Sequence, residues 1–404
     1  MSAGLTGDLR NGLEWAILKH HIVVRRRLPG VCPVGGSMTS IYLIRHAEAE
    51  GNLYRIAQGQ YDSILTDRGW RQVRALEKRF EGVHIDRVYT SDLYRTCATA
   101  SALYRPRGLT PIRRKDLREI CVGVWEQKTW GEIARRDPEQ MENFATRLYL
   151  WHMKGAETPY EVRDRALQAI REIAAENEGK TVAVFSHGCA IRLVLAELQG
   201  YSMESLGETP HGDNTAVSLL EWENGELKVV YRDDNSHLQT PEYLALEQNF
   251  KRANALEAGL FFQPLEGGEP CLGFAAEGWA QSGRQEPFDK ERFLQSAAER
   301  PTVVGYLGQE PVGLVQFGPE EGWISYLTIR QDCRRKGYGI QLIGQAVQHW
   351  RQTGAKALRM ALPPQAPACK FLTDYGFVSV GTTAEGRTVL EKDIHFEPEF
   401  LSDL

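Results

Sequence analysis

The sequence predicts an α/β protein with more than one domain. From Met38 onward, short runs of β-branched residues alternate with runs that carry an apolar face at helical spacing, which is typical of α/β folds. The chain has 404 residues, and at about 150 residues per domain this length indicates two or three domains. With 42% hydrophobic and 25% charged residues, the composition is that of a globular protein.

Charge, cysteines and hydropathy exclude several classes of protein. The formal net charge of −5 offers no basic stripe for a nucleic-acid backbone, so nucleic acid is not an expected partner. The seven cysteines lack CxxC spacing, which argues against a disulfide framework or a zinc cluster and favours the cytoplasm. No apolar run approaches the ~18 residues of a membrane span, so no membrane association is expected. The oligomeric state is left open.

Residues 1–37 differ from the rest of the chain. They contain five basic and two acidic residues and end in the Gly-Gly-Ser that precedes Met38. We predict that 1–37 is a disordered extension or an over-long start, with a targeting or docking arm as the alternative.

The first predicted domain spans 38–238. Thr66 is placed to cap the first long helix, whose apolar face includes Val73, Leu76 and Phe80. Strands are expected at 41–44, 87–90 and 181–185, and further helices at about 92–103, 163–175 and 190–198.

The second predicted domain spans 239–404, because the periodicity lapses between Asp233 and Pro241. It is expected to begin with a mixed helical stretch. Gly and Pro residues then predict a section rich in loops, at Gly267, Gly268, Pro270, Gly273 and Gly278. Strands at 312–317 and 323–329 and a helix at 339–352 are expected to follow.

Polar side chains follow each of the three strands predicted in the first domain. Arg45 and His46 follow the first strand, Arg95 lies shortly after the second, and His187 follows the third. Ligands of open α/β sheets bind beyond the carboxyl ends of the strands, so these residues are expected to meet. Guanidinium groups match phosphate oxygens and an imidazole can attack phosphorus, so the set predicts phosphoryl transfer.

The segment from Met38 to about residue 238 resembles the histidine phosphatase superfamily, which has the phosphoglycerate-mutase-like three-layer α/β/α fold. Five motifs carry the resemblance in the order of the family: Arg45-His46-Ala47-Glu48 with Asn52, Leu65-Thr66-Asp67-Arg68-Gly69, Ser91-Asp92-Leu93-Tyr94-Arg95-Thr96, Leu117-Arg118-Glu119 with Gly123 and Trp125-Glu126, and Ser186-His187-Gly188.

The resemblance implies a role for each matching residue. His46 matches the nucleophile that becomes transiently phosphorylated. Arg45, Arg95 and His187 match the groups that hold the phosphoryl oxygens, and Asn52 is an auxiliary contact. The family needs no metal, because two guanidinium groups and an imidazolium can offset the developing charge.

The proton donor to the leaving oxygen is assigned less firmly. Glu119 matches the family position and would then deprotonate the attacking water. Glu126 and Glu157 lie near enough in the sequence to compete for this role. The segment Gly155-Ala156-Glu157-Thr158 also resembles a family helix start, where capping and catalysis are both open.

The family contains phosphatases and mutases. A mutase must protect its phosphohistidine from water, whereas a phosphatase admits water. Gly51 precedes Asn52 here, where the mutase branch has a tryptophan, so we expect a phosphomonoester hydrolase acting on a small phosphorylated metabolite, with a phosphoglycerate-type mutase as the alternative. The segment from about 128 to 160 is expected to shape the pocket.

The region from about 250 to 396 resembles the GNAT acetyltransferase fold, a second α/β domain. The carrying motif is the turn Arg334-Arg335-Lys336-Gly337-Tyr338-Gly339, with Phe371 and Tyr375-Gly376-Phe377 further on. In that family an Arg-x-x-Gly-x-Gly turn binds the pyrophosphate of acetyl-CoA at a helix start. The resemblance implies cofactor contacts from Arg334, Arg335, Gly337, Gly339 and the backbone of Leu327 to Ile329.

The acetyl-transfer step itself is less well supported. The tyrosine that often serves as general acid in the family is Leu372 here, and Tyr375 could take that role or simply pack. We therefore expect acetyl-CoA binding, with an unknown amine as acceptor if the domain is catalytic. The alternative is a CoA-sensing or scaffolding module with a degenerate acetyltransferase half.

Overall fold

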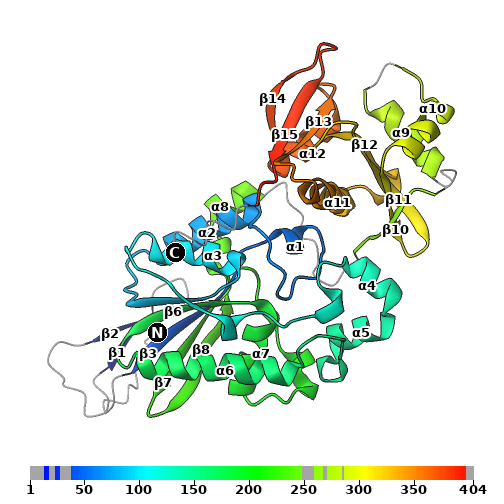
Figure 1. Ribbon diagram of the computed structural model, residues 1–404. Helices are drawn as coiled ribbons and strands as arrows, with labels where there is room; N and C mark the ends of the chain where they lie inside the picture. Colours follow the sequence, from blue (N-terminus) through cyan, green and yellow to red (C-terminus); the bar gives the residue numbers. More distant parts are fainter. Residues whose placement is uncertain are drawn as a thin grey trace, which may run out of the picture.

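The computed structural model describes residues 13–17, 23–27, 38–247, 259–266, 271–283 and 286–396. Figure 1 shows two α/β units, with the first half of the chain below and the yellow-to-red second half above. Ahead of Met38, β1 (Leu13–Ile17) pairs with β2 (Val23–Arg27) in antiparallel fashion. Most of 1–37 lies outside the described residues, so the expectation for that segment stays a prediction.

The first domain is built on one six-stranded sheet of order β5-β4-β6-β3-β7-β8. The first four strands of this order are parallel to one another. β7 pairs with β3 in antiparallel fashion, and β8 pairs with β7 in antiparallel fashion. The three predicted strands are confirmed as β3, β4 and β6, and β6 lies between the other two. The strands are β3 (Thr39–Arg45), β4 (Arg87–Ser91), β5 (Ile112–Arg114), β6 (Thr181–Ser186), β7 (Val217–Glu223) and β8 (Glu226–Asp234).

Helices cover both faces of this sheet, which gives the predicted three layers. Successive strand residues point to opposite faces, so Leu43 packs in the core under α6 and α7 and Ile44 in the core under α2 and α3. Figure 1 shows these two helix pairs on opposite sides of the strands. The helices are α2 (Asp67–Arg79), α3 (Tyr94–Tyr104), α6 (Pro159–Glu176) and α7 (Gly188–Leu198).

Threonine side chains cap the first turns of two of these helices. Thr66 caps α2, since its side chain accepts a hydrogen bond from Gly69 N–H. Thr158 caps α6 and forms a capping box with Glu161.

The other elements from α1 to α8 are short. They are α1 (Glu50–Leu53), η2 (Lys115–Leu117), η3 (Gly123–Trp125), α4 (Trp130–Arg136), α5 (Pro138–Thr146), η4 (Leu148–Leu150), η5 (Glu204–Glu208), η6 (Ser236–Leu238) and α8 (Pro241–Glu247). Within the part of the chain that is described, no helix is both long and apolar enough to cross a bilayer.

The second domain contains two antiparallel sheets, of orders β12-β11-β10-β9 and β13-β15-β14. One isolated bridge, between Trp323 and Arg359, connects them. The strands are β9 (Phe261–Pro264), β10 (Thr302–Leu307), β11 (Glu310–Phe317), β12 (Ile324–Ile329), β13 (Ala357–Leu362), β14 (Val378–Thr382) and β15 (Thr388–Asp393).

Four helices pack on these sheets, and one of them corrects the sequence analysis. They are α9 (Leu272–Gln281), α10 (Lys290–Glu299), α11 (Tyr338–Gln352) and α12 (Pro367–Asp374). Of the residues predicted to lie in loops, Gly267, Gly268 and Pro270 are outside the described residues, whereas Gly273 and Gly278 lie inside α9 and not in a loop. At Gly278 a Cβ would lie 2.0 Å from Thr328 Oγ1, so the glycine allows close packing of α9 on β12 and does not mark a turn.

Candidate active site

The parallel strands bring their carboxyl ends to one edge of the sheet. Arg45, the last residue of β3, is aligned with Ser186 at the end of β6, and Thr90 of β4 is aligned with Phe185. His46 and His187 are the next residues after β3 and β6, and their ring centroids are 5.2 Å apart. Side chains from distant parts of the sequence therefore meet, as predicted.

The hydrogen bonds of His46 define its reactive nitrogen. Its Nδ1 lies 2.7 Å from the carbonyl oxygen of Ala47. A carbonyl can only accept, so Nδ1 carries the proton and Nε2 keeps a lone pair. Burial lowers the pKa of His46 well below its usual range, and the charges of Arg95 and Arg45 lower it further. The imidazole is therefore neutral and nucleophilic at Nε2.

His187 is oriented by β4. Its Nε2 lies 2.9 Å from Ser91 Oγ, and that hydroxyl accepts a hydrogen bond from Leu93 N–H. Ser91 can thus donate its own proton to Nε2, which leaves the ring proton on Nδ1. Burial, followed by the charge of Arg95, lowers the pKa of His187 well below its usual range. The positive charge beside the two histidines therefore comes from guanidinium groups and not from an imidazolium.

The two arginines are held by backbone carbonyls. Arg95 donates to Gly59 O at 2.7 Å and to Tyr61 O at 2.9 Å, and Arg45 donates to Gly212 O. Gly188 leaves room for Arg45, because a Cβ there would lie 3.1 Å from the guanidinium carbon and crowd it. Both guanidinium groups are therefore fixed before any ligand binds.

Three buried nitrogens of this group have no hydrogen-bond partner within the described part of the chain. They are Nε of Arg45, Nε of Arg95 and Nδ1 of His187. An unpartnered buried donor costs about 1–3 kcal/mol, so three in neighbouring side chains indicate that a ligand supplies the acceptors. An anion with several oxygens, such as a phosphoryl group, meets this requirement.

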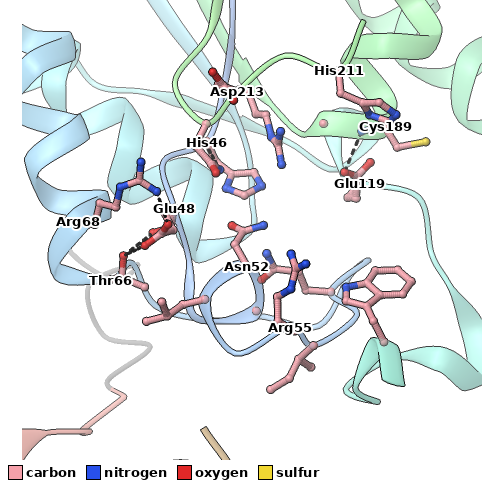
Figure 2. A pocket seen from close by; sticks show the side chains of 18 of the residues that line it. His46, Glu48, Asn52, Arg55, Thr66, Arg68, Glu119, Cys189, His211 and Asp213 are labelled. Carbon is pink, nitrogen blue, oxygen red and sulfur yellow. Dashed lines mark hydrogen bonds and ion pairs between the residues drawn. The ribbon is translucent and has the colours of Figure 1, made fainter. Parts of the chain in front are cut away.

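The carboxylate of Glu119 lies against the first turn of α7. Its carboxylate accepts hydrogen bonds from the N–H groups of Cys189 at 3.0 Å, Ala190 at 3.1 Å and Ile120 at 3.0 Å. Figure 2 shows Glu119 facing the same space as His46 and Asn52. A carboxylate so held is fixed in place in the lining that also contains His46.

The two competing glutamates are occupied elsewhere. Glu126 accepts from the N–H groups of Gly59, Gln60 and Tyr61, so it supports the loop whose carbonyls hold Arg95. Glu157 pairs with Arg165 at 2.7 Å. Neither lines the cavity described next, whereas Glu119 does.

The site opens into a cavity of about 640 Å³. Arg45, His46, Asn52 and Glu119 line it, whereas Arg95 and His187 lie deeper and are fully buried. The amide oxygen of Asn52 accepts from Ala49 N–H at 3.0 Å. The segment expected to shape the pocket contributes apolar residues to the wall, at Trp130, Met141, Phe144, Ala145 and Leu148.

Sequence reasoning missed the residues that hold the His46 backbone. Asn214 Nδ2 donates to His46 O at 3.0 Å, and Ala47 N–H donates to Thr99 Oγ1 at 2.9 Å. Ser91 was recognised only as part of the motif that contains Arg95, and its hydrogen bond to His187 was not predicted. Asn214 and Thr99 come from a loop and a helix with no local sequence signal for this role.

The predicted pyrophosphate turn precedes α11. Gly337 has φ +83° and starts the helix, a conformation that favours glycine. At Gly339 a Cβ would lie 3.0 Å from the ring of Phe371. Arg334 donates from Nε to Ile329 O at 2.9 Å and also bonds Gln281, while Arg335 adopts φ +60°.

The remaining cofactor positions lie on β12, which is an edge strand of its sheet. Leu327 and Ile329 pair with Val315 and Gly313 of β11. The opposite edge of β12 is therefore the one at which a pantetheine arm would pair. Leu372 is fully buried. Among the described residues, no group of His, Cys, Asp and Glu is arranged to hold a metal ion.

Comparison with known families agrees with this geometry. The model of the histidine phosphatase superfamily (branch 1) matches residues 41–235, and that of the acetyltransferase (GNAT) family matches residues 270–377. The chain therefore belongs to the histidine phosphatase superfamily through its first domain, which has the phosphoglycerate-mutase-like fold, and carries a GNAT domain after it.

Individual relatives match the first domain. Phosphoserine phosphatase 1 of Hydrogenobacter thermophilus is 26% identical over 201 residues, which cover 50% of this chain and 95% of that protein. A probable phosphoglycerate mutase GpmB of Serratia proteamaculans is 31% identical over 163 residues, covering 40% and 76%. The solved structure of Bacillus stearothermophilus YhfR has 33% identity and a TM-score of 0.48, covering 50% of this chain and 99% of its own.

Proposed function

We propose that the first domain is a phosphoric monoester hydrolase that works without a metal, through a phosphohistidine at His46. One observation carries this proposal: three unpartnered buried nitrogens, of Arg45, Arg95 and His187, lie around a histidine whose Nε2 has a free lone pair. Together they form a binding site for a phosphoryl group next to a nucleophile.

The reaction proceeds in two steps. In the first, Nε2 of His46 attacks phosphorus, the ester P–O bond breaks, and Glu119 gives its proton to the leaving oxygen. In the second, Glu119 takes a proton from water as that water attacks phosphorus, and the P–N bond breaks to release inorganic phosphate. Arg45 and Arg95 offset the charge that develops on the phosphoryl oxygens.

Replacing the nucleophile tests this proposal. His46→Ala should lower kcat for 4-nitrophenyl phosphate by at least ~1,000-fold while leaving the thermal unfolding curve in place. His84→Ala is the matched control, because the His84 side chain is 82% exposed and lies outside the cavity. If His46→Ala turns over the ester about as fast as the control, His46 is not the nucleophile.

Hydrolysis is proposed over the mutase alternative. The glycine that precedes Asn52 supports hydrolysis, since the mutase branch has a tryptophan there. Supplying 3-phosphoglycerate separates the two activities: release of free phosphate supports a phosphatase, and formation of 2-phosphoglycerate without free phosphate would establish a mutase.

For the second domain we propose acetyl-CoA binding at the Gly337 turn. The left-handed glycine at the start of a 15-residue helix supports it, because the helix start favours an anion. Gly337→Asp should weaken acetyl-CoA binding at least ~10-fold by calorimetry through charge repulsion, whereas Gly337→Asn, which tolerates the same backbone, should not. Equal affinity of both variants for acetyl-CoA would contradict the proposal that the cofactor binds at this turn.

Transfer to an amine is a further step. The buried Leu372 at the family's acid position supports binding more than catalysis. Binding without acetylation of any amine in a substrate screen would favour a CoA-sensing module. We also propose a cytoplasmic location, which the free thiols of the six described cysteines support.

A further inference from the structure

The cavity in front of His46 is bounded by both domains. Beside the residues of the first domain, its wall includes Gly337 and Ile340 from the start of α11 and Asp374 and Tyr375 from the end of α12. The second domain therefore forms part of the compartment in which the phosphoester is bound.

The two domains are held together close to the site. Glu50 in α1 lies four residues after His46 and pairs with Arg351 of α11 at 2.8 and 3.0 Å. Glu50 is buried, with 6% exposure. In the same region Tyr54 packs among the apolar core residues of the second domain. The second domain thus contacts the chain segment that directly follows the nucleophile.

A second set of contacts joins α4 to α11. The buried Leu260 donates its N–H to Gln341 Oε1 at 2.8 Å and accepts from Thr129 Oγ1 at 3.0 Å. At Gly131 a Cβ would lie 2.1 Å from the carbonyl oxygen of Gly259, so the backbones touch there. These contacts fix the wall formed by α11 relative to the apolar wall that begins at Trp130.

The end of α12 rests on the start of α2. Lys392 pairs with Asp67 at 3.0 Å, and a Cβ at Gly376 would lie 2.0 Å from Asp67 Oδ2. The neighbouring Tyr375 is affected electrostatically by Glu48 and Arg68 of the first domain, although burial is the main reason that its pKa is raised. Tyr375 is partly buried and lines the cavity together with Glu48 and Arg68 of the first domain.

The size and lining of the cavity indicate what it accepts. About 640 Å³ falls in the range of about 300–1,000 Å³ that is typical of sites for drug-sized ligands. Part of the lining is apolar or aromatic, with Trp130, Met141, Phe144 and Leu148 from the first domain and Ile340 and Tyr375 from the second. The rest is largely polar and includes the guanidinium groups of Arg55, Arg68 and Arg71. A phosphorylated three-carbon acid held at His46 would leave most of this lining without contact.

From these observations we propose that the preferred substrate is a phosphomonoester of an extended, partly aromatic alcohol of about nucleoside size, and that Ile340 and Tyr375 of the second domain determine this specificity. The inference rests on the proposed function of the first domain. Its new element is that residues of the GNAT domain contact the leaving group of the phosphatase reaction.

The test compares two alkyl phosphates of different size. The leaving groups of adenosine 5′-monophosphate and O-phosphoserine are both primary alcohols, so their chemistry at phosphorus is similar and the difference reports on leaving-group contacts. The wild-type chain should hydrolyse the nucleotide with a kcat/KM at least ~10-fold higher. An equal or higher kcat/KM for phosphoserine would overturn the inference.

Variants then locate the contact. Tyr375→Ala should raise KM for the nucleotide at least ~10-fold with little change in kcat, and should leave phosphoserine hydrolysis within about twofold. Tyr160→Ala is the matched control, since Tyr160 is 41% exposed on α6 and lies outside the cavity. If Tyr375→Ala does not fold, Tyr375→Phe and Ile340→Val retain the packing and should each raise the same KM by a smaller factor.

The outcomes separate the two claims. Equal loss for both esters in the Tyr375 variants, or no loss for either, would show that the second domain does not contact the leaving group while the first domain still hydrolyses phosphoesters. Failure to release phosphate from any ester would instead contradict the proposed function, and this inference would fail with it.

Discussion

The two proposed phosphate sites of this molecule are built from different groups, one from buried side chains and the other from backbone. In the first domain, buried side chains from three strand ends converge, and three of their nitrogens lack partners in the described part of the chain. In the second domain the site is a glycine turn at a helix start, and its Arg334 already bonds the carbonyl oxygen of Ile329. The first site holds unpaired donors ready for a ligand, whereas the second relies on backbone.

This difference teaches how strongly each site depends on single residues. Buried, fixed guanidinium groups cannot be replaced by solvent, so losing one removes both charge and shape. A backbone turn keeps its N–H groups under most substitutions, and one side chain contributes less. The following predictions test this contrast.

The largest expected effect is at Arg95. Arg95→Met should lower kcat for 4-nitrophenyl phosphate by about 100- to 1,000-fold, whereas Arg334→Met should leave it unchanged and weaken acetyl-CoA binding only modestly. Arg95→Met also removes the donor to Gly59 O and Tyr61 O, so Arg95→Lys, which retains a charge, is measured beside it. More than a tenth of the wild-type kcat in both Arg95 variants would break the contrast.

A smaller effect is expected at Glu119, and it should depend on the leaving group. Glu119→Gln should slow esters with poor leaving groups about 100-fold and activated aryl esters by no more than a few-fold, because only the former need a proton. Glu126→Gln serves as the control. It should lower the unfolding temperature, because Glu126 accepts several backbone N–H groups, without any dependence on the leaving group. Equal slowing of both ester classes by Glu119→Gln would assign it a structural role.

The last prediction concerns a difference in acid stability between the domains. The first domain contains His46, His187, His211 and His237 with lowered pKa values, to about 4 for His211 and about 3 for His237, mainly through burial. In the second domain, burial lowers the pKa of His349. A histidine whose folded pKa is below its unfolded value of about 6.5 takes up its proton more readily when unfolded, so its contribution is complete above that pH and is lost as the pH falls toward the folded pKa.

Each such histidine should therefore destabilise the first domain by up to about 1.4 kcal/mol per pH unit below 6.5. Hydrogen exchange measured between pH 7 and pH 5 should show β3, β4 and β6 losing protection before β11 and β15 do. His237→Gln should make this loss less steep. Earlier loss in the second domain would show that buried histidines do not govern acid unfolding.

Much of the first site could be predicted from sequence. Arg45, His46 and His187 follow buried strands directly, and the geometry of a parallel sheet brings such ends together. The fold class and both family assignments are confirmed, since the motifs are local and ordered. The turn before α11 was predictable for the same reason, because glycine spacing is visible in the sequence.

The parts that could not be predicted depend on contacts between distant residues. The pairing of Glu50 with Arg351 spans 301 positions, and nothing near either residue indicates it. Asn214 supports His46 from a loop with no regular pattern. Gly278 was assigned to a loop because its composition suggests a turn, whereas its actual role is to let α9 approach Thr328, which only packing shows.

The most direct test of the central claim is to trap the phosphorylated enzyme. The full chain is mixed with phosphorus-labelled 4-nitrophenyl phosphate, quenched within a single turnover, digested and mapped by mass spectrometry. Label on Nε2 of His46, absent from His46→Ala and retained longer in Glu119→Gln, is the predicted result. Turnover at the normal rate with no label on His46, or with label on another residue, would contradict it.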